Sequence, residues 1–246
     1  MLRHTGFAVV IAVGSLVTTP ATQSHADEAT LAAGAGFRRP IAELATAYKA
    51  QSGHTILQIY GHMGQVTAQA RDSSQITLVC GDRAVLQNAK GIDFDRTARL
   101  GMGKLVVAYR KGLSLTKPED VTRDDIRRIG IPDQANAIYG KAGRQFLERS
   151  KLASTVDAKL IPVATVPQVT SYVVSGEVDA GFVNATDAIG AGSNIGGFVE
   201  VDARLYEPVE VVCGVRGAEK TSPATDGFVN FLATDQARKI LERYGL

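Results

Sequence analysis

Apolar positions along the chain follow two alternating spacings, in which short apolar runs precede stretches of helical periodicity. Residues 41, 44, 45 and 48, for example, recur at the spacing of one helix face, whereas residues 76–80 are apolar or small throughout. The expected strands span residues 56–60, 76–80, 104–109, 128–132, 159–164, 179–183 and 209–215. The expected helices span residues 41–51, 64–71, 82–88, 139–150 and 165–175, and two more begin at residues 222 and 234.

This alternation predicts an α/β fold built from repeated strand–helix units. Strands that are apolar throughout occur mainly in parallel sheets covered by helices on both faces. We expect about nine strands, and two sheets of four or five strands suit the chain length better than one sheet of nine. The candidates for strands that cross between the sheets are residues 104–109 and 209–215, because both are followed by loop residues.

Residues 1–26 have the composition of a cleaved secretory signal peptide. Arg3 lies near the start, residues 6–17 form an apolar run too short to span a bilayer, and Ser24 and Ala26 provide a cleavage site. A buried N-terminal helix is the alternative, but charge, length and cleavage site together disfavour it. We therefore expect the mature chain to be exported to the periplasm without inserting into the membrane.

Composition and charge exclude several classes of function. The 246 residues are 45% hydrophobic and carry a formal net charge of +2, which provides no electrostatic footprint for nucleic acid or an anionic membrane. The two cysteines, Cys80 and Cys213, are able to form one disulfide in an oxidising compartment. The sequence alone does not show whether they meet.

Two segments carry a family resemblance, DQANAIYGKAGRQFLERSKL at residues 133–152 and TVPQVTSYVVSGEVDAGFVNATDA at residues 165–188. Together they resemble the periplasmic molybdate-binding proteins of ABC importers. Weaker matches at residues 42–53, 103–112 and 228–246 extend the resemblance over nearly the whole mature chain. The resemblance implies a type II solute-binding fold, in which two α/β lobes are joined by a two-strand hinge and enclose a ligand cleft.

The resemblance also implies a division of the chain and a function. Residues 27–104 and 214–246 would form a discontinuous first lobe, and residues 105–213 a second lobe with the hinge strands at its edges. The implied protein is a monomer that captures a small molybdate-like oxyanion and delivers it to the membrane permease of an ABC importer. It would need no cofactor and would catalyse no reaction.

The implied ligand site lies at helix N-termini that face the cleft, where backbone N–H groups and helix dipoles bind anions. The family's two backbone donors correspond here to Tyr139 and Val166. Its three side-chain hydroxyl donors are absent. Gly36 and the His62–Met63 turn occupy the two Ser positions, and Asn184 occupies the Tyr position.

These replacements indicate a retained scaffold with an altered ligand site. Each missing charge-assisted hydrogen bond costs about 1–3 kcal/mol, so three losses argue against an unchanged molybdate site. His62 is the residue that we most expect to touch the ligand. The full expected ligand set is Gly36, Phe37, Arg38, His62, Met63, Tyr139, Val166 and Asn184.

Two alternative ligands remain open. His62, Met63 and Cys80 offer nitrogen, thioether and thiol groups that suit copper or another thiophilic metal, although Met63 and Cys80 also suit simple packing. Arg38 and Arg39 are able to clamp a small organic anion through their guanidinium groups, or to form a solvated first helical turn.

Whether Cys80 is free to bind a metal depends on how the fold places the two cysteines. In the fold that the resemblance implies, the returning strand at residues 209–215 often lies beside the third strand, which would make Cys80 and Cys213 cross-strand neighbours. A disulfide would remove Cys80 from any metal site, so the two ideas compete. An enzyme with Cys80 as nucleophile and His62 as base has no supporting local motif.

Overall fold

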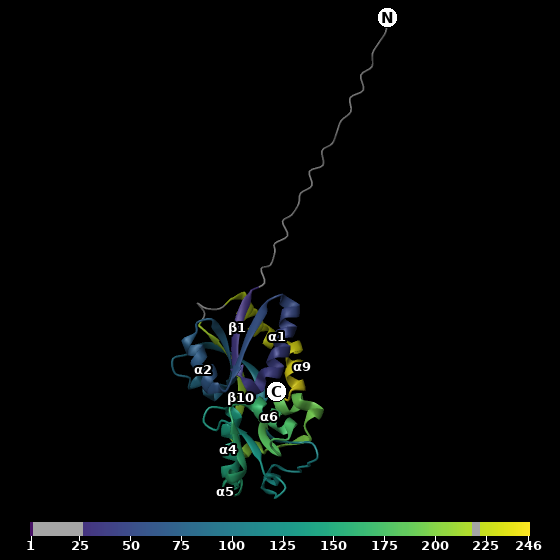
Figure 1. The fold of residues 1–246 in the computed structure, drawn as a ribbon. Coiled ribbons are helices and arrows are strands. Elements are labelled where there is room, and N and C mark those ends of the chain that lie inside the picture. The colour runs from purple at the N-terminus through teal and green to yellow at the C-terminus, as the bar shows by residue number, and fades with distance from the viewer. Residues whose placement is uncertain (2–26, 218–221) are drawn as a thin grey trace.

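The computed structural model describes residue 1, residues 27–217 and residues 222–246. The expected signal peptide falls on residues outside this description, apart from Met1. The described strands form two five-stranded sheets, stacked as an upper and a lower lobe in Figure 1. The α/β architecture expected from the sequence is confirmed. Among the described residues, the helices are all too short or too polar to cross a membrane.

The first lobe is built on a sheet of order β2-β1-β3-β10-β4, in which β10 alone runs antiparallel to the other four strands. Its strands are β1 (Glu28–Gly34), β2 (Thr55–Gly61), β3 (Ile76–Asp82), β4 (Phe94–Gly103) and β10 (Val209–Arg216). Its helices are α1 (Arg38–Ser52), α2 (Met63–Asp72), α3 (Arg83–Gln87), α8 (Pro223–Leu232) and α9 (Asp235–Arg243), with the 3-10 turn η1 (Ala35–Phe37) before α1.

The sheet of the first lobe is covered on both faces, which explains why its central strands are apolar throughout. Leu31 of β1 packs in the same core as Leu44 of α1, whereas the next residue, Ala32, packs with Val66 of α2. Successive side chains of a strand point to opposite faces, so both sets of positions must be apolar when helices cover both faces.

The second lobe is built on a sheet of order β7-β6-β8-β5-β9. Its strands are β5 (Leu105–Tyr109), β6 (Ile129–Pro132), β7 (Leu160–Val163), β8 (Ala180–Asn184) and β9 (Gly197–Glu200). Its helices are α4 (Ile138–Arg149), α5 (Ala153–Val156), α6 (Val166–Ser175) and α7 (Ala185–Ala191). Its 3-10 turns are η2 (Pro118–Thr122), η3 (Asp157–Lys159), η4 (Gly192–Asn194) and η5 (Ala203–Leu205).

The chain passes between the lobes in two places, at Lys104 between β4 and β5 and at residues 201–208 between β9 and β10. The prediction that strands 104–109 and 209–215 themselves cross is wrong, since β5 lies wholly in the second sheet and β10 wholly in the first. The expected boundary at residue 213 therefore falls inside β10. We propose that the first lobe comprises residues 27–104 and 209–246 and the second lobe residues 105–208.

A disulfide joins two neighbouring strands of the first sheet. β10 runs antiparallel to β3, with Cys213 directly opposite Cys80, and their sulfur atoms are bonded. The cross-strand position expected for the two cysteines is confirmed. The metal alternative loses its thiol ligand, because the Cys80 sulfur is already bonded to Cys213.

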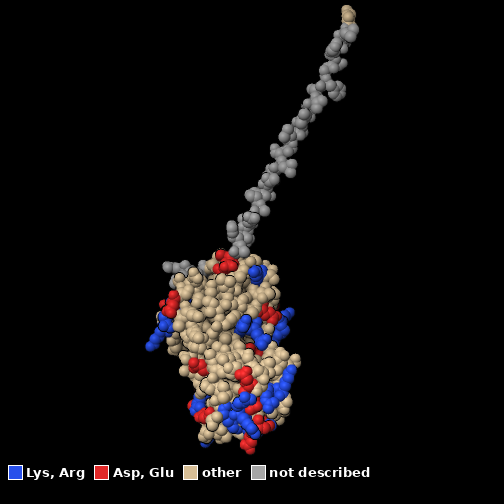
Figure 2. Space-filling model, in the orientation of Figure 1, with Lys and Arg blue, Asp and Glu red and all other residues tan. Residues whose placement is uncertain are grey.

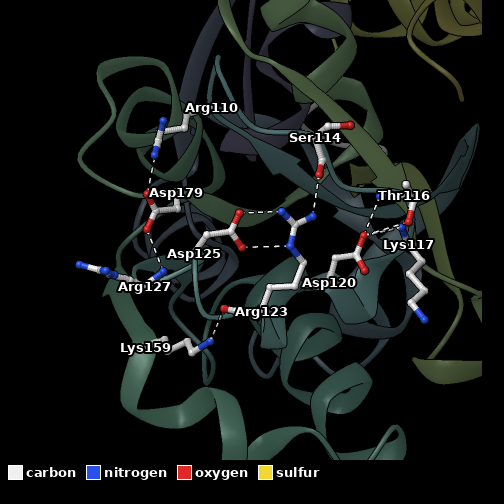
Figure 3. A network of polar contacts seen from close by, with 10 residues as sticks. All are labelled: Arg110, Ser114, Thr116, Lys117, Asp120, Arg123, Asp125, Arg127, Lys159 and Asp179. Carbon is white, nitrogen blue, oxygen red and sulfur yellow. Dashed lines mark hydrogen bonds and ion pairs between the residues drawn. The ribbon is translucent and has the colours of Figure 1, made fainter.

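Charged side chains are mixed in sign over the face drawn in Figure 2, where basic and acidic residues lie interspersed on the second lobe. Many of them form local ion pairs. In the network of Figure 3, Arg123 pairs with Asp125, and the Asp179 carboxylate accepts hydrogen bonds from Arg110 and from the backbone N–H of Arg127.

Candidate functional site

A small pocket lies between the lobes where four helical segments begin. Its water-accessible volume is about 20 Å³, and about 10–15 Å³ of such volume holds one water molecule. The pocket therefore has room for a small compact ligand. It is lined by Gly34, Ala35, Gly36, Phe37, Gly61, His62, Met63, Ala137, Ile138, Tyr139, Thr165 and Val166.

Sheet topology explains why these segments meet. Each follows the carboxyl end of a parallel strand: η1 follows β1, α2 follows β2, α4 follows β6 and α6 follows β7. In the first lobe Gly34 is in register with Gly61, so the turns that end β1 and β2 lie side by side. Open α/β sheets bind ligands at this edge.

Three of these helix starts, in the described part of the chain, have no side-chain cap. Neither η1 with α1, nor α4, nor α6 begins with a capping hydrogen bond from a side chain, and none has an acidic residue in its first turn. By contrast, Asp82, Ser222 and Thr234 cap α3, α8 and α9. The first N–H groups of a helix lack intrahelical partners, and this end carries partial positive charge. The pocket thus gathers free donors that suit an anion.

The fourth helix start, that of α2, is capped by the side chain of His62. Its Nδ1 accepts a hydrogen bond from the backbone N–H of Gln65 at 3.2 Å and so caps α2. In a neutral imidazole whose Nδ1 is an acceptor, the proton is on Nε2. His62 is partly buried and lines the pocket, and it therefore has one N–H group to offer to a ligand.

Asp133, an acidic residue of the second lobe in the loop before α4, is engaged within that loop. The Asp133 carboxylate accepts hydrogen bonds from the backbone N–H groups of Asn136 and Ala135, at 2.9 and 2.8 Å. These bonds, led by that of the Asn136 backbone N–H, lower the pKa of Asp133. Among the described residues, the pocket lining contains no Asp or Glu.

Met63 lines the pocket but is mainly a packing residue. It is 2% exposed and lies in the core between α2 and the first sheet. A Cβ atom added to Gly81 would lie 2.6 Å from the Met63 sulfur, so that glycine makes room for it. With Cys80 in a disulfide, the proposed set of His62, Met63 and Cys80 does not form a metal site, and the described residues contain no cluster of three His, Cys, Asp or Glu that would hold an ion.

Asn184 joins the two lobes beside the pocket. Its Nδ2 donates to the Gly36 carbonyl oxygen at 2.8 Å, and its Oδ1 accepts from the backbone N–H of Asp187, which caps α7. A Cβ atom at Gly36 would lie 3.0–3.2 Å from the Asn184 amide group. Gly36 and Asn184, two of the three departures from the family pattern, therefore contact each other directly. The amide of Asn184 contacts Gly36 rather than lining the pocket.

The two arginines lie outside the pocket. The Arg38 guanidinium lies 5.9 Å from the ring centroid of Tyr60. Arg39 reaches across to the second lobe, where its Nε is 3.3 Å from Oδ1 of Asp187, a carboxylate whose side chain is 4% exposed. Both arginines line a separate groove between α1 and α6, so the expected contact of Arg38 with a ligand in the small pocket is not part of this structure.

The structure brings six of the eight expected ligand residues to one pocket, namely Gly36, Phe37, His62, Met63, Tyr139 and Val166. The pocket is also lined by Thr165, which is not among the expected ligand residues and whose side chain does not cap α6. A Thr before a helix is a typical cap. Only the placement of the lobes shows that it faces a pocket.

Comparisons with known proteins agree with this architecture. Residues 29–246 match the family model for bacterial extracellular solute-binding proteins. The chain is 24% identical over 243 residues to the molybdate-binding protein of Azotobacter vinelandii, covering 96% of both chains. It is 25% identical over 241 residues to that of Rhodobacter capsulatus, covering 94% of this chain and 92% of the relative. These relatives are binding proteins, not enzymes.

The solved structure of the Azotobacter vinelandii periplasmic molybdate-binding protein matches with a TM-score of 0.79 at 23% identity, over 88% of this chain and 97% of that one. This match shows a shared fold, and it confirms the two-lobed binding-protein fold that the sequence resemblance implies. The family match covers almost all of the described residues. The chain therefore belongs to the bacterial extracellular solute-binding protein family.

Proposed function

We propose that the protein captures a small, fully ionised oxyanion in the pocket between its lobes and delivers it to the permease of an ABC importer. The observation that carries this proposal is the convergence of three uncapped helix starts and of the His62 side chain, which caps a fourth, on one small pocket. The similarity to molybdate-binding proteins supports molybdate or tungstate as the first candidates. The signal-like residues 1–26 and the periplasmic relative support export to the periplasm.

The chemistry of the lining supports an anion that carries no proton. Backbone N–H groups only donate hydrogen bonds, and the described lining contains no carboxylate to accept one. Molybdate, tungstate and sulfate are fully deprotonated at neutral pH, whereas inorganic phosphate retains a proton that needs an acceptor. We therefore expect the pocket to favour the first three ions over phosphate.

Capture and release follow from the position of the pocket. The lining comes from both lobes, with Gly36 and His62 from the first and Tyr139 and Val166 from the second. An anion that binds groups of both lobes stabilises their closed arrangement, since it contacts all of them only when the lobes are together. Opening at the two interlobe passages would release it to the permease.

A thermal-shift series with titration calorimetry tests this function. We expect molybdate or tungstate to raise the melting temperature, because a ligand at 100 times its Kd stabilises the native state by about 2.7 kcal/mol. Phosphate at the same concentration serves as the ligand control. A shift with a small organic acid or a metal ion, together with none from any oxyanion, would refute the proposal.

A single substitution in the lining tests whether the oxyanion binds in this pocket. Ala137 precedes α4 in the lining and gives that helix no side-chain cap. Ala137→Asp should cap the helix and keep the fold, because Asp is a favoured N-cap residue. Its carboxylate would repel an oxyanion, so we expect normal melting of the unligated protein and no oxyanion-induced shift.

A further inference from the structure

We infer that the hydroxyl of Thr165 is a direct hydrogen-bond partner of the bound oxyanion and a determinant of its affinity. The inference rests on the proposed function, since it names a donor in the same pocket. Thr165 lines the pocket next to Val166, at the start of α6.

Thr165 occupies the N-cap position of α6, but its side chain makes no capping hydrogen bond. Its backbone is extended, with φ −141° and ψ 160°, as at most helix starts, yet its side chain accepts no hydrogen bond from α6. At the other helix starts of the described residues where Ser, Thr, Asp or Asn occupies this position, the side chain does cap. These residues are Asp82, Asn184, Asp202, Ser222 and Thr234.

The first turn of α6 offers fewer donors than usual to a capping side chain. Pro167 has no N–H, which removes one donor that a capping oxygen would accept from. Gln168 directs its Oε1 back to the backbone N–H of Ala164 at 3.1 Å. This helix start therefore brings two donor-bearing residues to the pocket, Val166 with its backbone N–H and Thr165 with its hydroxyl.

Two donors on neighbouring residues suit one oxyanion. The Val166 N–H and the Thr165 hydroxyl belong to the second lobe, and His62 lines the pocket from the first. A hydroxyl is neutral, so it adds a donor without a countercharge, and its bond to an anion is charge-assisted. Thr165 therefore compensates in part for the absence of Ser, Thr or Tyr side chains at residues 36, 62 and 184.

The test compares two threonines at equivalent helix positions. Thr165→Val removes the hydroxyl at nearly constant shape, and Thr234→Val does the same at the start of α9, where Thr234 accepts from the N–H of Ala237. For Thr165→Val we expect the affinity for the oxyanion that the wild type binds most tightly to fall about tenfold to a hundredfold, with the melting temperature of the unligated protein unchanged. For Thr234→Val we expect the reverse.

Two further variants complete the design. Thr165→Ser retains a hydroxyl and should bind within about threefold of the wild type, whereas Thr165→Ala should match Thr165→Val and replaces it if the valine variant does not fold. Wild-type affinity in both hydroxyl-free variants overturns the inference and leaves the proposed function standing. Loss of unligated stability equal to that of Thr234→Val also overturns it, because Thr165 would then be a cap. A wild type that binds no oxyanion refutes the proposed function itself.

Discussion

Single residues at the helix starts decide what the pocket is able to bind. A side-chain cap consumes a backbone N–H, so Ala137 at α4 and the non-capping Thr165 at α6 leave donors free. The sequence predicts the positions of Tyr139 and Val166 well, because a backbone donor depends only on where the helix begins. It does not predict the roles of Arg39 and Asn184, because their partners lie 148 residues away in the other lobe.

Two variants of His62 distinguish its role as a helix cap from its role in ligand binding. His62→Ala should lower the free energy of unfolding by about 0.5–2 kcal/mol through the lost cap, and should also weaken oxyanion binding. His62→Asp should restore the stability, because Asp is a good cap, yet abolish binding, because its charge repels the anion. Urea unfolding and titration calorimetry on both variants make the measurement. Full binding by His62→Asp would show that this turn does not face the ligand.

At the scale of elements, the sequence predicts most of the central strands and misses two edge strands, β4 and β9. β3, β5 and β8 lie inside their sheets and are buried almost throughout, which gives the apolar runs that reveal them. β4 lies at the edge of the first sheet and exposes much of its length, including charged side chains such as Arg96 and Arg99. A half-covered edge strand produces no continuous apolar run.

A buried carboxylate at the start of β8 connects three segments of the second lobe. Asp179 is 6% exposed, and it accepts hydrogen bonds from the backbone N–H groups of Arg127 and Arg128 and from Nε of Arg110 (Figure 3). Burial has the largest single influence and raises the pKa of Asp179, but these hydrogen bonds together outweigh it and lower the pKa below its ordinary value.

The lowered pKa of Asp179 gives a pH-dependent prediction. A carboxyl whose pKa is lower in the folded than in the unfolded state stabilises the fold above its unfolded value of about 3.9, and this contribution is lost as the pH falls through the folded value. Asp179→Asn should therefore lower the free energy of unfolding at about pH 7 by about 1–3 kcal/mol, with a smaller deficit at about pH 3.

The exposed Asp125 of the same network supplies the control for this experiment. Its side chain is 50% exposed and pairs with Arg123. Asp125→Asn should leave the free energy of unfolding nearly unchanged at either pH, because exposed ion pairs contribute little. A deficit of Asp179→Asn that stays constant from neutral to acidic pH would contradict the assignment. Urea unfolding followed by circular dichroism measures both variants.

At the scale of the whole molecule, direct contacts between the lobes hold them together without a bound ligand. Arg39 pairs with Asp187, Asn184 donates to Gly36, and the rings of Phe37 and Tyr139 meet edge to face at 6.1 Å. These three contacts therefore stabilise the closed arrangement of the lobes even when no ligand is bound. Apparent affinity rises with the population of the binding-competent form, so these contacts strengthen ligand binding from a distance.

Weakening the closed form should therefore weaken binding. Arg39→Gln removes the interlobe ion pair, and we expect oxyanion affinity to fall about twofold to fivefold, through faster dissociation, since a partly exposed pair contributes about 0.2–1 kcal/mol. Small-angle scattering should show a larger radius for the unligated variant. Arg38→Gln is the matched control, because Arg38 lies on Tyr60 of its own lobe. Identical affinity and radius in Arg39→Gln and the wild type would rule out this role.

The place of β10 in the first sheet has a consequence for the order in which the protein is made. β10 lies between β3 and β4, so β4 pairs with the rest of its sheet only through β10. During synthesis from the N-terminus, β4 emerges more than a hundred residues before its partner, and the entire second lobe is produced in that interval. The second lobe is one continuous stretch of chain and can fold as soon as it has been synthesised. The first sheet can be completed only after β10 has been synthesised.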